Sequence, residues 1–209
     1  MAKFVTFIDT EVGVDDHKIH DIGAIRQDRA SFHAANIREF AAFMEGTEYI
    51  CGHNILHHDL KYLQNALGYE LPAIKIDTLY LSPLLFPKRP YHALLKDDKL
   101  QSDQLNDPVN DCKKAATLFY DEVNAFFELP SKVKQIFCCL LYDHPEFHGF
   151  FRYVNFRPYQ VNVPELIRAE YEGQICSNAE LLPLIRHYPV ELAYALALVG
   201  AKDEHSITP

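Results

Sequence analysis

The sequence predicts an α/β fold: a mixed five-stranded sheet flanked by helices, followed by a helical C-terminal region. Three strand-like segments come first in hairpin order, and the later strand-like segments alternate with helical ones. After about residue 129 the strand signals stop and apolar helical segments follow. The length of 209 residues suits one domain with an appendage. We therefore expect one domain over residues 1–129 and a helical accessory region over residues 130–209.

Short runs of β-branched and aromatic residues predict the strands. Only residues 27–30 separate the second strand from the third, which is short enough for a hairpin, so these two strands should run antiparallel. The expected strands are residues 3–8, 20–26, 31–37, 48–51 and 74–79.

Helical spacing of apolar residues and helix-boundary residues predict the helices. Four leucines between residues 56 and 67 recur at helical spacing, and Gly68 then ends that helix. Asp107 followed by Pro108 supplies an N-cap and a proline at the first helical position. The expected helices are residues 38–44, 55–67, 80–86 and 108–129, with two or three more over residues 164–200 that break at Gly173 and Pro189.

This order of elements is compatible with a ribonuclease-H-like architecture and equally with other mixed sheets. The fold class alone therefore decides nothing about function.

The net charge of −9 argues against a protein that coats nucleic acid with a basic surface. It does not argue against a metal-dependent nuclease, because bound cations neutralise a carboxylate cluster and then attract phosphate. A locally basic rim would suffice for such an enzyme, and an ordinary solvated surface is the competing explanation for each of its residues. The candidates for that rim are Lys88, Arg89, Lys96, Lys99, Lys113 and Lys114.

Three features of the sequence predict a cytoplasmic protein with no membrane partner. No apolar run approaches the ~20 residues that a bilayer crossing needs. The first residues lack the apolar stretch and cleavage site of a signal peptide. The five cysteines form no CxxC pair, and an odd number fits poorly with a disulfide framework.

Asp9 and Glu11 follow the first apolar strand and are the first candidate metal ligands. They are two residues apart, so they lie on one face of the strand. The carboxyl ends of strands are where open α/β sheets usually bind ligands. The competing explanation is an ordinary strand-to-turn junction.

Two more acidic residues each fall in the first turn of an expected helix. Asp59 follows a strand that stops at Gly52, and Asp111 follows the predicted cap at Asp107. Each is also explained as a favourable charge at a helix start. If they converge with the first pair, they form the carboxylate cluster that two-metal phosphodiester hydrolysis needs, and hard oxygen ligands select Mg²⁺ or Mn²⁺.

Three motifs, in this order, resemble those of the DEDD superfamily of 3′–5′ exonucleases: FIDTE at residues 7–11, GHNILHHDLKYL at 52–63 and NDPVNDCKKA at 106–115. The resemblance covers roughly residues 3–127 and includes IDTLYLSPLLFP at residues 76–87. It implies a ribonuclease-H-like fold and a site for two Mg²⁺ or Mn²⁺ ions. It also implies roles for six residues: Asp9, Glu11, Asp59 and Asp111 as metal ligands, Thr10 as a contact of the terminal nucleotide, and Asn54 as a residue that positions the site.

One residue departs from the family pattern. The histidine-bearing branch has a histidine base five residues before the last aspartate, where this sequence has Asn106; the tyrosine-bearing branch has its tyrosine at the place of Asp107. An asparagine amide orients a water but does not take its proton near neutral pH. Three explanations follow: a slower enzyme in which Asn106 only orients the water, a substitute base such as His92 or Asp107, or a domain that has lost catalysis and kept binding.

The expected activity is the release of nucleotides from single-stranded 3′ ends of DNA or RNA. The alternative is a catalytically weak or silent exonuclease-like module that binds nucleic acid or protein. The whole chain, through residues 206–209, also resembles the N-terminal segment of bacterial proteins that continue into a RecQ-like helicase. From that resemblance, and from the end of the chain without a closing signal, we expect a longer polypeptide with a helicase region.

Overall fold

The computed structural model describes residues 4–92, 94 and 107–201 of the chain. The chain divides into two compact units, residues 1–80 with 93–121 and residues 81–92 with 122–209. The division falls within helix α4 (Pro108–Glu128), which ends one residue before the boundary expected at 129.

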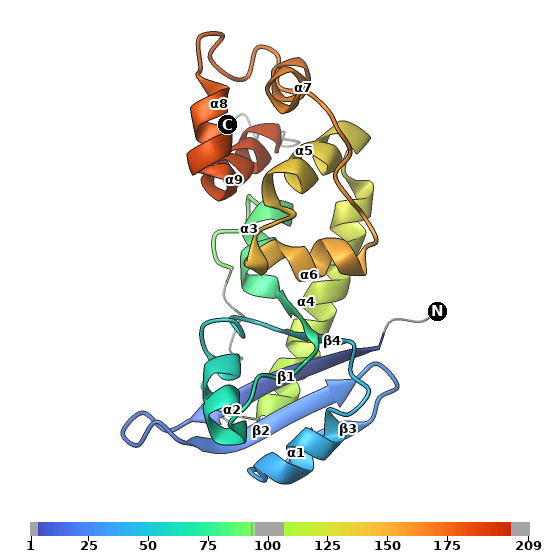
Figure 1. Ribbon diagram of the computed structural model, residues 1–209, viewed down its shortest axis with the longest axis vertical. Helices are drawn as coiled ribbons and strands as arrows, with labels where there is room; N and C mark the ends of the chain where they lie inside the picture. The colour runs from blue at the N-terminus through green and yellow to red at the C-terminus, as the bar shows by residue number, and fades with distance from the viewer. Residues whose placement is uncertain (1–3, 93, 95–106, 202–209) are drawn as a thin grey trace, which may run out of the picture. The chain divides into compact units, whose positions relative to one another are not determined.

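The first unit has the α/β fold that the sequence predicts, with a mixed five-stranded sheet in the order β3-β2-β1-β4-β5 (Figure 1). β1 pairs antiparallel with β2 and parallel with β4, β2 and β3 are antiparallel, and β4 and β5 are parallel. This topology is ribonuclease-H-like. The strands are β1 (Val5–Val12), β2 (Ile19–Arg26), β3 (Ser31–His33), β4 (Tyr49–Gly52) and β5 (Ile74–Asp77).

Helices cover both faces of the sheet because the side chains of β1 alternate between two apolar layers. Ile8 belongs to a buried cluster with Phe40 of α1 (Ile37–Phe43) and Leu63 of α2 (Asp59–Leu67). Phe7 points to the other face, where its ring lies 5.8 Å from that of Phe119 of α4. Asp9 and Glu11 continue the series of Phe7 and therefore belong to the α4 face.

Two strands differ in length from the sequence prediction. β1 was expected to end at residue 8 but continues to Val12, because its pairing with β2 runs on through the polar residues. β3 was expected to reach residue 37 but ends at His33. Asn36 then caps α1 by accepting from two backbone N–H groups, so the chain turns into a helix where a strand was predicted.

Two helices also begin away from their predicted positions. α2 begins at Asp59 and not at residue 55, because the residues before it form a turn in which Asn54 has a left-handed backbone (φ 65°). β5 ends at Asp77, so Thr78 opens helix α3 (Thr78–Leu85) where the sequence predicted the end of a strand.

The second unit is helical, as the sequence predicts for the C-terminal region. Phe126, Phe150, Phe151 and Phe156 form an aromatic cluster in which the ring of Phe126 is 5.4–5.9 Å from the other three. Its helices after α4 are α5 (Ser131–Leu141), α6 (Pro145–Tyr153), α7 (Val163–Glu170), α8 (Leu181–His187) and α9 (Pro189–Gly200).

The predicted breaks in this region are both observed. Gly173 lies between α7 and α8, and Pro189 is the first residue of α9. In the part of the chain that the structure describes, we find no helix with the length and apolar character that crossing a membrane requires.

Candidate metal centre

Asp9 and Glu11 lie side by side on β1 and face α4. Their neighbours across the β1–β2 pairing are Gly23 and Asp21. Both carboxylates are partly buried, so neither is freely solvated. β1 thus presents two carboxylates on the face of the sheet that α4 covers.

The start of α4 comes close to β2 because residue 23 is a glycine. A Cβ atom built there would lie 2.4 Å from the carbonyl carbon of Pro108 and 2.6 Å from the backbone nitrogen of Val109. The thiol of Cys112 also donates to the carbonyl oxygen of Gly23 at 3.3 Å. Only a residue without a side chain permits this approach, and Gly23 is the direct pairing partner of Asp9.

Asp107 caps α4 as predicted, because its side chain accepts from the backbone N–H of Val109 at 2.9 Å. This cap and the contact at Gly23 place Asp111, in the first turn of α4, over the strand. One carboxylate oxygen each from Asp9, Glu11 and Asp111 lies within 4.8 Å of the others. Three of the four predicted metal ligands therefore come together, although they are up to 102 residues apart in the sequence.

Asp59, the fourth predicted ligand, lies next to this group and is held by Thr10. Its Oδ1 accepts from both the backbone N–H and the hydroxyl of Thr10, each at 2.7 Å. Asp59 is 2% exposed, and it is not one of the three residues with mutually close oxygens. Thr10, predicted to contact the terminal nucleotide, is itself buried and uses its hydroxyl on Asp59.

Crowding of these carboxylates changes the protonation of Asp9. Burial, and then the negative charges of Asp59, Asp111 and Glu11, raise its pKa to about 8, and the charge of His58 opposes the shift. In the metal-free protein, the crowded carboxylates therefore favour a proton on Asp9 near neutral pH. A divalent cation would replace that proton and remove the repulsion, which is the behaviour expected of a metal centre.

The turn before Asp59 is fixed by a buried aspartate, Asp77, whose role the sequence did not reveal. Asp77 is fully buried and accepts from three backbone N–H groups, those of Asn54 at 2.7 Å and of Leu56 and Leu79 at 3.0 Å each. The left-handed residue Asn54, predicted to position the site, is thus tied to β5 through its backbone.

Gly52 allows the same turn to approach the sheet. A Cβ atom at this position would lie 2.6 Å from the carbonyl oxygen of Ile8 and 2.3 Å from the side chain of Ile55. The chain can therefore turn directly after β4 and return Asp59 to the edge where Asp9 lies.

Two histidines beside Asp59 have different partners. His58 Nδ1 lies 3.7 Å from Asp59 Oδ2, and the neighbouring Asp59 carboxylate is the main cause that raises the pKa of His58. His57 instead pairs with the hydroxyl of Tyr80. The sequence offered no signal that separates the two, because both precede the same aspartate.

The residues proposed to affect water activation are placed as follows. Asn106 lies outside the described residues. The side chain of Asp107 accepts from the backbone N–H of Val109 as the N-cap of α4. His92 belongs to the second unit, where its Nδ1 is 2.9 Å from the hydroxyl oxygen of Ser82 and burial lowers its pKa.

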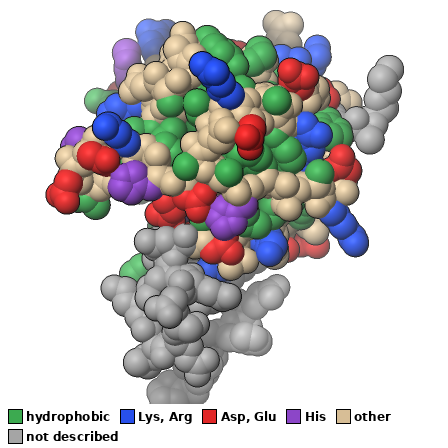
Figure 2. Space-filling view, turned by 90° about the horizontal axis from the view of Figure 1, so that it is seen from below, with side chains coloured by type: hydrophobic (Ala, Val, Ile, Leu, Met, Phe, Trp, Pro, Cys, Tyr) green, Lys and Arg blue, Asp and Glu red, His purple; other side chains and the backbone are tan. Residues whose placement is uncertain are grey.

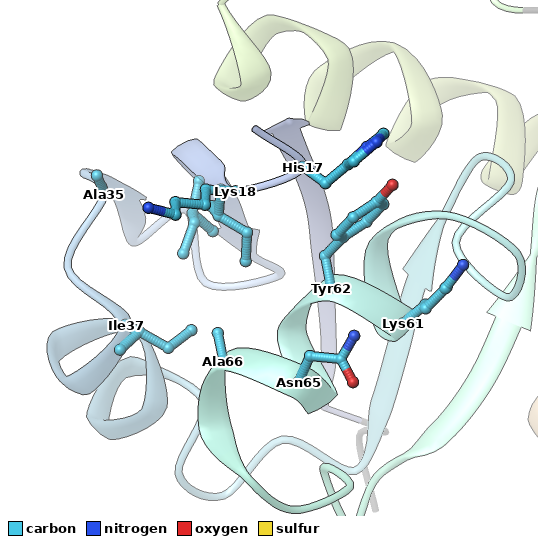
Figure 3. Close-up of a pocket in the computed structure, with 10 residues that line it drawn as sticks. His17, Lys18, Ala35, Ile37, Lys61, Tyr62, Asn65 and Ala66 are labelled. Carbon is cyan, nitrogen blue, oxygen red and sulfur yellow. The ribbon is translucent and has the colours of Figure 1, made fainter. Parts of the chain in front are cut away.

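A groove of about 680 Å³ lies in the first unit between the β1–β2 hairpin, the region that enters α1, and α2. Figure 3 shows His17 on the hairpin side, Tyr62 and Lys61 on the α2 side, and Ile37 near the opposite end. The ring of Tyr62 is 5.3 Å from that of His58, which neighbours Asp59. Through Tyr62, the wall of the groove contacts His58, the residue that precedes Asp59.

The surface of the first unit carries both signs of charge. Figure 2 shows acidic and histidine side chains beside one another, with Lys and Arg dispersed among other residues and no continuous basic area in the coloured part of this view. At the site itself, Lys114 Nζ lies 3.4 Å from Asp111.

Searches of protein-family models, of curated proteins and of solved structures each found no match to this chain.

Proposed function

We propose that the first unit is a 3′–5′ exonuclease domain of the DEDD type that uses Mg²⁺ or Mn²⁺ to release nucleotides from single-stranded ends of DNA or RNA. One observation carries the proposal: oxygens of Asp9, Glu11 and Asp111 lie within 4.8 Å of one another on a ribonuclease-H-like sheet. Asp59 lies close enough that its charge raises the pKa of Asp9.

The donor set fits hard divalent cations. The group consists of carboxylates alone, and oxygen ligands favour Mg²⁺ or Mn²⁺ over zinc. When bound, a pair of such ions supplies a hydroxide nucleophile and stabilises the leaving oxygen. Mg²⁺ holds its oxygens at ~2.0–2.1 Å, so oxygens of three residues that lie within 4.8 Å of one another would need only a small shift to reach one ion.

The residues around the carboxylates have defined tasks in this proposal. Thr10 fixes the orientation of Asp59 through two hydrogen bonds. Tyr62 offers an aromatic face on which an unpaired base can stack, and Lys61 offers a cation for a phosphate, both from the wall of the groove. An unpaired end suits such a site because its terminal nucleotide is free to leave a stack.

The test is degradation of end-labelled single-stranded oligonucleotides with Mn²⁺. We expect a 5′-labelled strand to shorten stepwise while a 3′ label is released as a mononucleotide, for DNA, RNA or both. Asp9→Asn and Glu11→Gln keep the shape of the side chains and should abolish the activity. Glu45→Gln, an exposed site in the same unit, should not change it. Activity that survives both acidic substitutions would contradict the proposal.

The second candidate is a silent module that binds nucleic acid, which the asparagine at position 106 favours. The substitution Asn106→His separates the two. Loss of a general base costs roughly 10²–10⁴-fold in rate, so a large gain would show that the carboxylate geometry is intact and that the base limits turnover. Mn²⁺ binding without turnover, even in the Asn106→His variant, would favour the silent module.

The cytoplasmic location and a helicase region in the same polypeptide stay predictions. The sequence of the full-length gene product tests the second of these directly.

A further inference from the structure

The second unit contains a cavity of about 330 Å³ that takes no part in the proposed exonuclease. It is lined by the end of α3, the junction of α4 and α5, α5 itself, and the ends of α7 and α9. At ~30 Å³ per water molecule it has room for about ten waters. Pockets for small ligands begin at about this size, ~300 Å³.

The walls of the cavity are apolar. Leu84, Val133 and Phe137 line it and are between 1% and 9% exposed. Because these side chains come from different helices, the helical packing of the second unit shapes the cavity. Water in such a space is easily displaced by a hydrocarbon group.

The polar groups of the cavity lie together at the end of α7. Tyr171 is 2% exposed and lines the cavity. Burial, and then the charge of Glu170, raise the pKa of Tyr171 to about 12, so the phenol stays neutral. Glu170 adds a partly buried carboxylate, whose Oε2 is 3.9 Å from the Nζ of the largely exposed Lys132.

The end of α9 adds negative character on the same side. Gly200 and Ala201 line the cavity, and the last turn of α9 contains no basic residue. The carbonyl ends of a helix carry partial negative charge. A Cβ atom at Gly200 would come within 3.2 Å of the Tyr171 ring, so the glycine keeps this end of the cavity open.

None of the described residues that line the cavity is Lys, Arg or His. Its polar end therefore combines the carboxylate of Glu170, the phenol of Tyr171, the amide of Gln174 and a helix C-terminus. The carboxylate and the helix carbonyls favour a positive group, and the phenol and amide oxygens can accept hydrogen bonds from it. We propose that this cavity binds a small apolar amine, with the hydrocarbon part between α3 and α5 and the ammonium group at Glu170 and Tyr171.

Three probes of similar shape test the charge preference on the full chain: phenethylamine, phenethyl alcohol and phenylacetate. Their affinities are measured by calorimetry, and chemical-shift changes locate the site. We expect the amine to bind at least about tenfold more tightly than the alcohol, because it adds a charge-assisted hydrogen bond. Phenylacetate should bind most weakly, and the shifts should concentrate in α7 and α9.

Substitutions then test the assigned groups. Glu170→Gln should reduce the affinity for the amine to that for the alcohol and leave the alcohol unaffected, whereas Glu165→Gln, exposed on the same helix, should change neither. Thermal melts confirm that each variant is folded. The proposal is wrong if no probe binds, if phenylacetate binds as well as the amine, or if Glu170→Gln leaves the amine affinity unchanged. These outcomes are independent of nuclease activity.

Discussion

At the scale of single residues, the clustered carboxylates repel one another as long as no cation is bound between them. The pKa of Asp9 is raised because burial and three neighbouring acids all act in the same direction. Folding therefore places like charges close together, which costs free energy when no cation is bound. That cost is the residue-level argument for metal binding.

The affinity for Mn²⁺ should rise with pH up to about pH 8. Below the pKa of Asp9, a cation must displace its proton, so Kd should fall by about tenfold per pH unit and level off above about 8. Titration followed by the electron paramagnetic resonance of free Mn²⁺, between about pH 6 and 9, measures this dependence.

A matched variant checks the cause. Asp111→Asn removes one of the negative charges that raise the pKa of Asp9. The pH above which the Mn²⁺ affinity stops rising should therefore be lower in this variant, and the Mn²⁺ affinity should be weaker. An affinity for Mn²⁺ that is the same at pH 6 and pH 8 in the native protein would refute this account.

Removal of the Thr10 hydroxyl should weaken the hold on Asp59. Thr10→Val keeps the shape and the backbone N–H but removes one of two 2.7 Å hydrogen bonds to a buried carboxylate. We expect a loss of ~1.5–3 kcal/mol in the free energy of unfolding, measured in urea. Thr10→Ser keeps the hydroxyl and should lose less; an equal loss in both variants would assign the effect to packing.

At the scale of elements, two close approaches bring the site together. The start of α4 lies against β2 at Gly23, and the turn before α2 lies against β1 at Gly52. Asp107 and Asp77 then fix these two segments through backbone N–H groups. The carboxylates are thus placed by helix starts whose positions are set by neighbouring residues.

Gly23→Ala should therefore weaken metal binding, although Gly23 is not one of the proposed ligands. The added methyl group would overlap the backbone of Pro108, so α4 must move, at a cost of ~1–3 kcal/mol in stability. Because Asp111 moves with the helix, we expect the Mn²⁺ affinity to fall by ~10–100-fold, as for other changes that misorient ligands. Calorimetry and urea denaturation measure the two effects.

Gly46→Ala is the control for stability alone. Gly46 has a left-handed backbone (φ 78°) with no atom within 4 Å of an added Cβ, so the substitution costs ~1–2 kcal/mol through the backbone. Its Mn²⁺ affinity should equal that of the native protein. Equal losses of affinity in both variants would show that instability, and not displacement of α4, weakens the site.

Asp77→Asn should loosen the turn that leads into α2. An amide has one oxygen, so at least one of the three N–H groups that Asp77 satisfies loses its acceptor, at ~1–3 kcal/mol. Amide hydrogen exchange over residues 53–58 should become faster. Asp28, which accepts from the N–H of Ala30 in an exposed turn, offers the control Asp28→Asn, where exchange in that turn should change little because water replaces the bond.

At the scale of the whole molecule, local patterns in the sequence predicted the fold class, and the resemblance of three motifs to those of a known family implied that Asp9, Glu11 and Asp111 come together. Local patterns could place each of these acids only at a strand end or in the first turn of a helix. They did not predict the contact of Gly23, whose hydrogen-bond partner Cys112 lies 89 residues away. The end of β1 was also missed, because pairing with β2 and not local polarity decides where that strand stops.

The net charge of −9 predicts how the whole chain should engage nucleic acid. Without a basic coat, binding of single-stranded DNA should require a divalent cation at the carboxylates, so it should be absent in EDTA and appear with Ca²⁺, which permits binding without turnover. Few phosphates would be neutralised, so log K against log salt should have a shallow slope, about −1 to −3. Fluorescence anisotropy measures both properties.

Asp111→Asn makes the test discriminating, because it removes one negative charge and one ligand together. If general repulsion limits binding, the variant binds better in EDTA; if the cation bridges protein and phosphate, it binds worse in Ca²⁺.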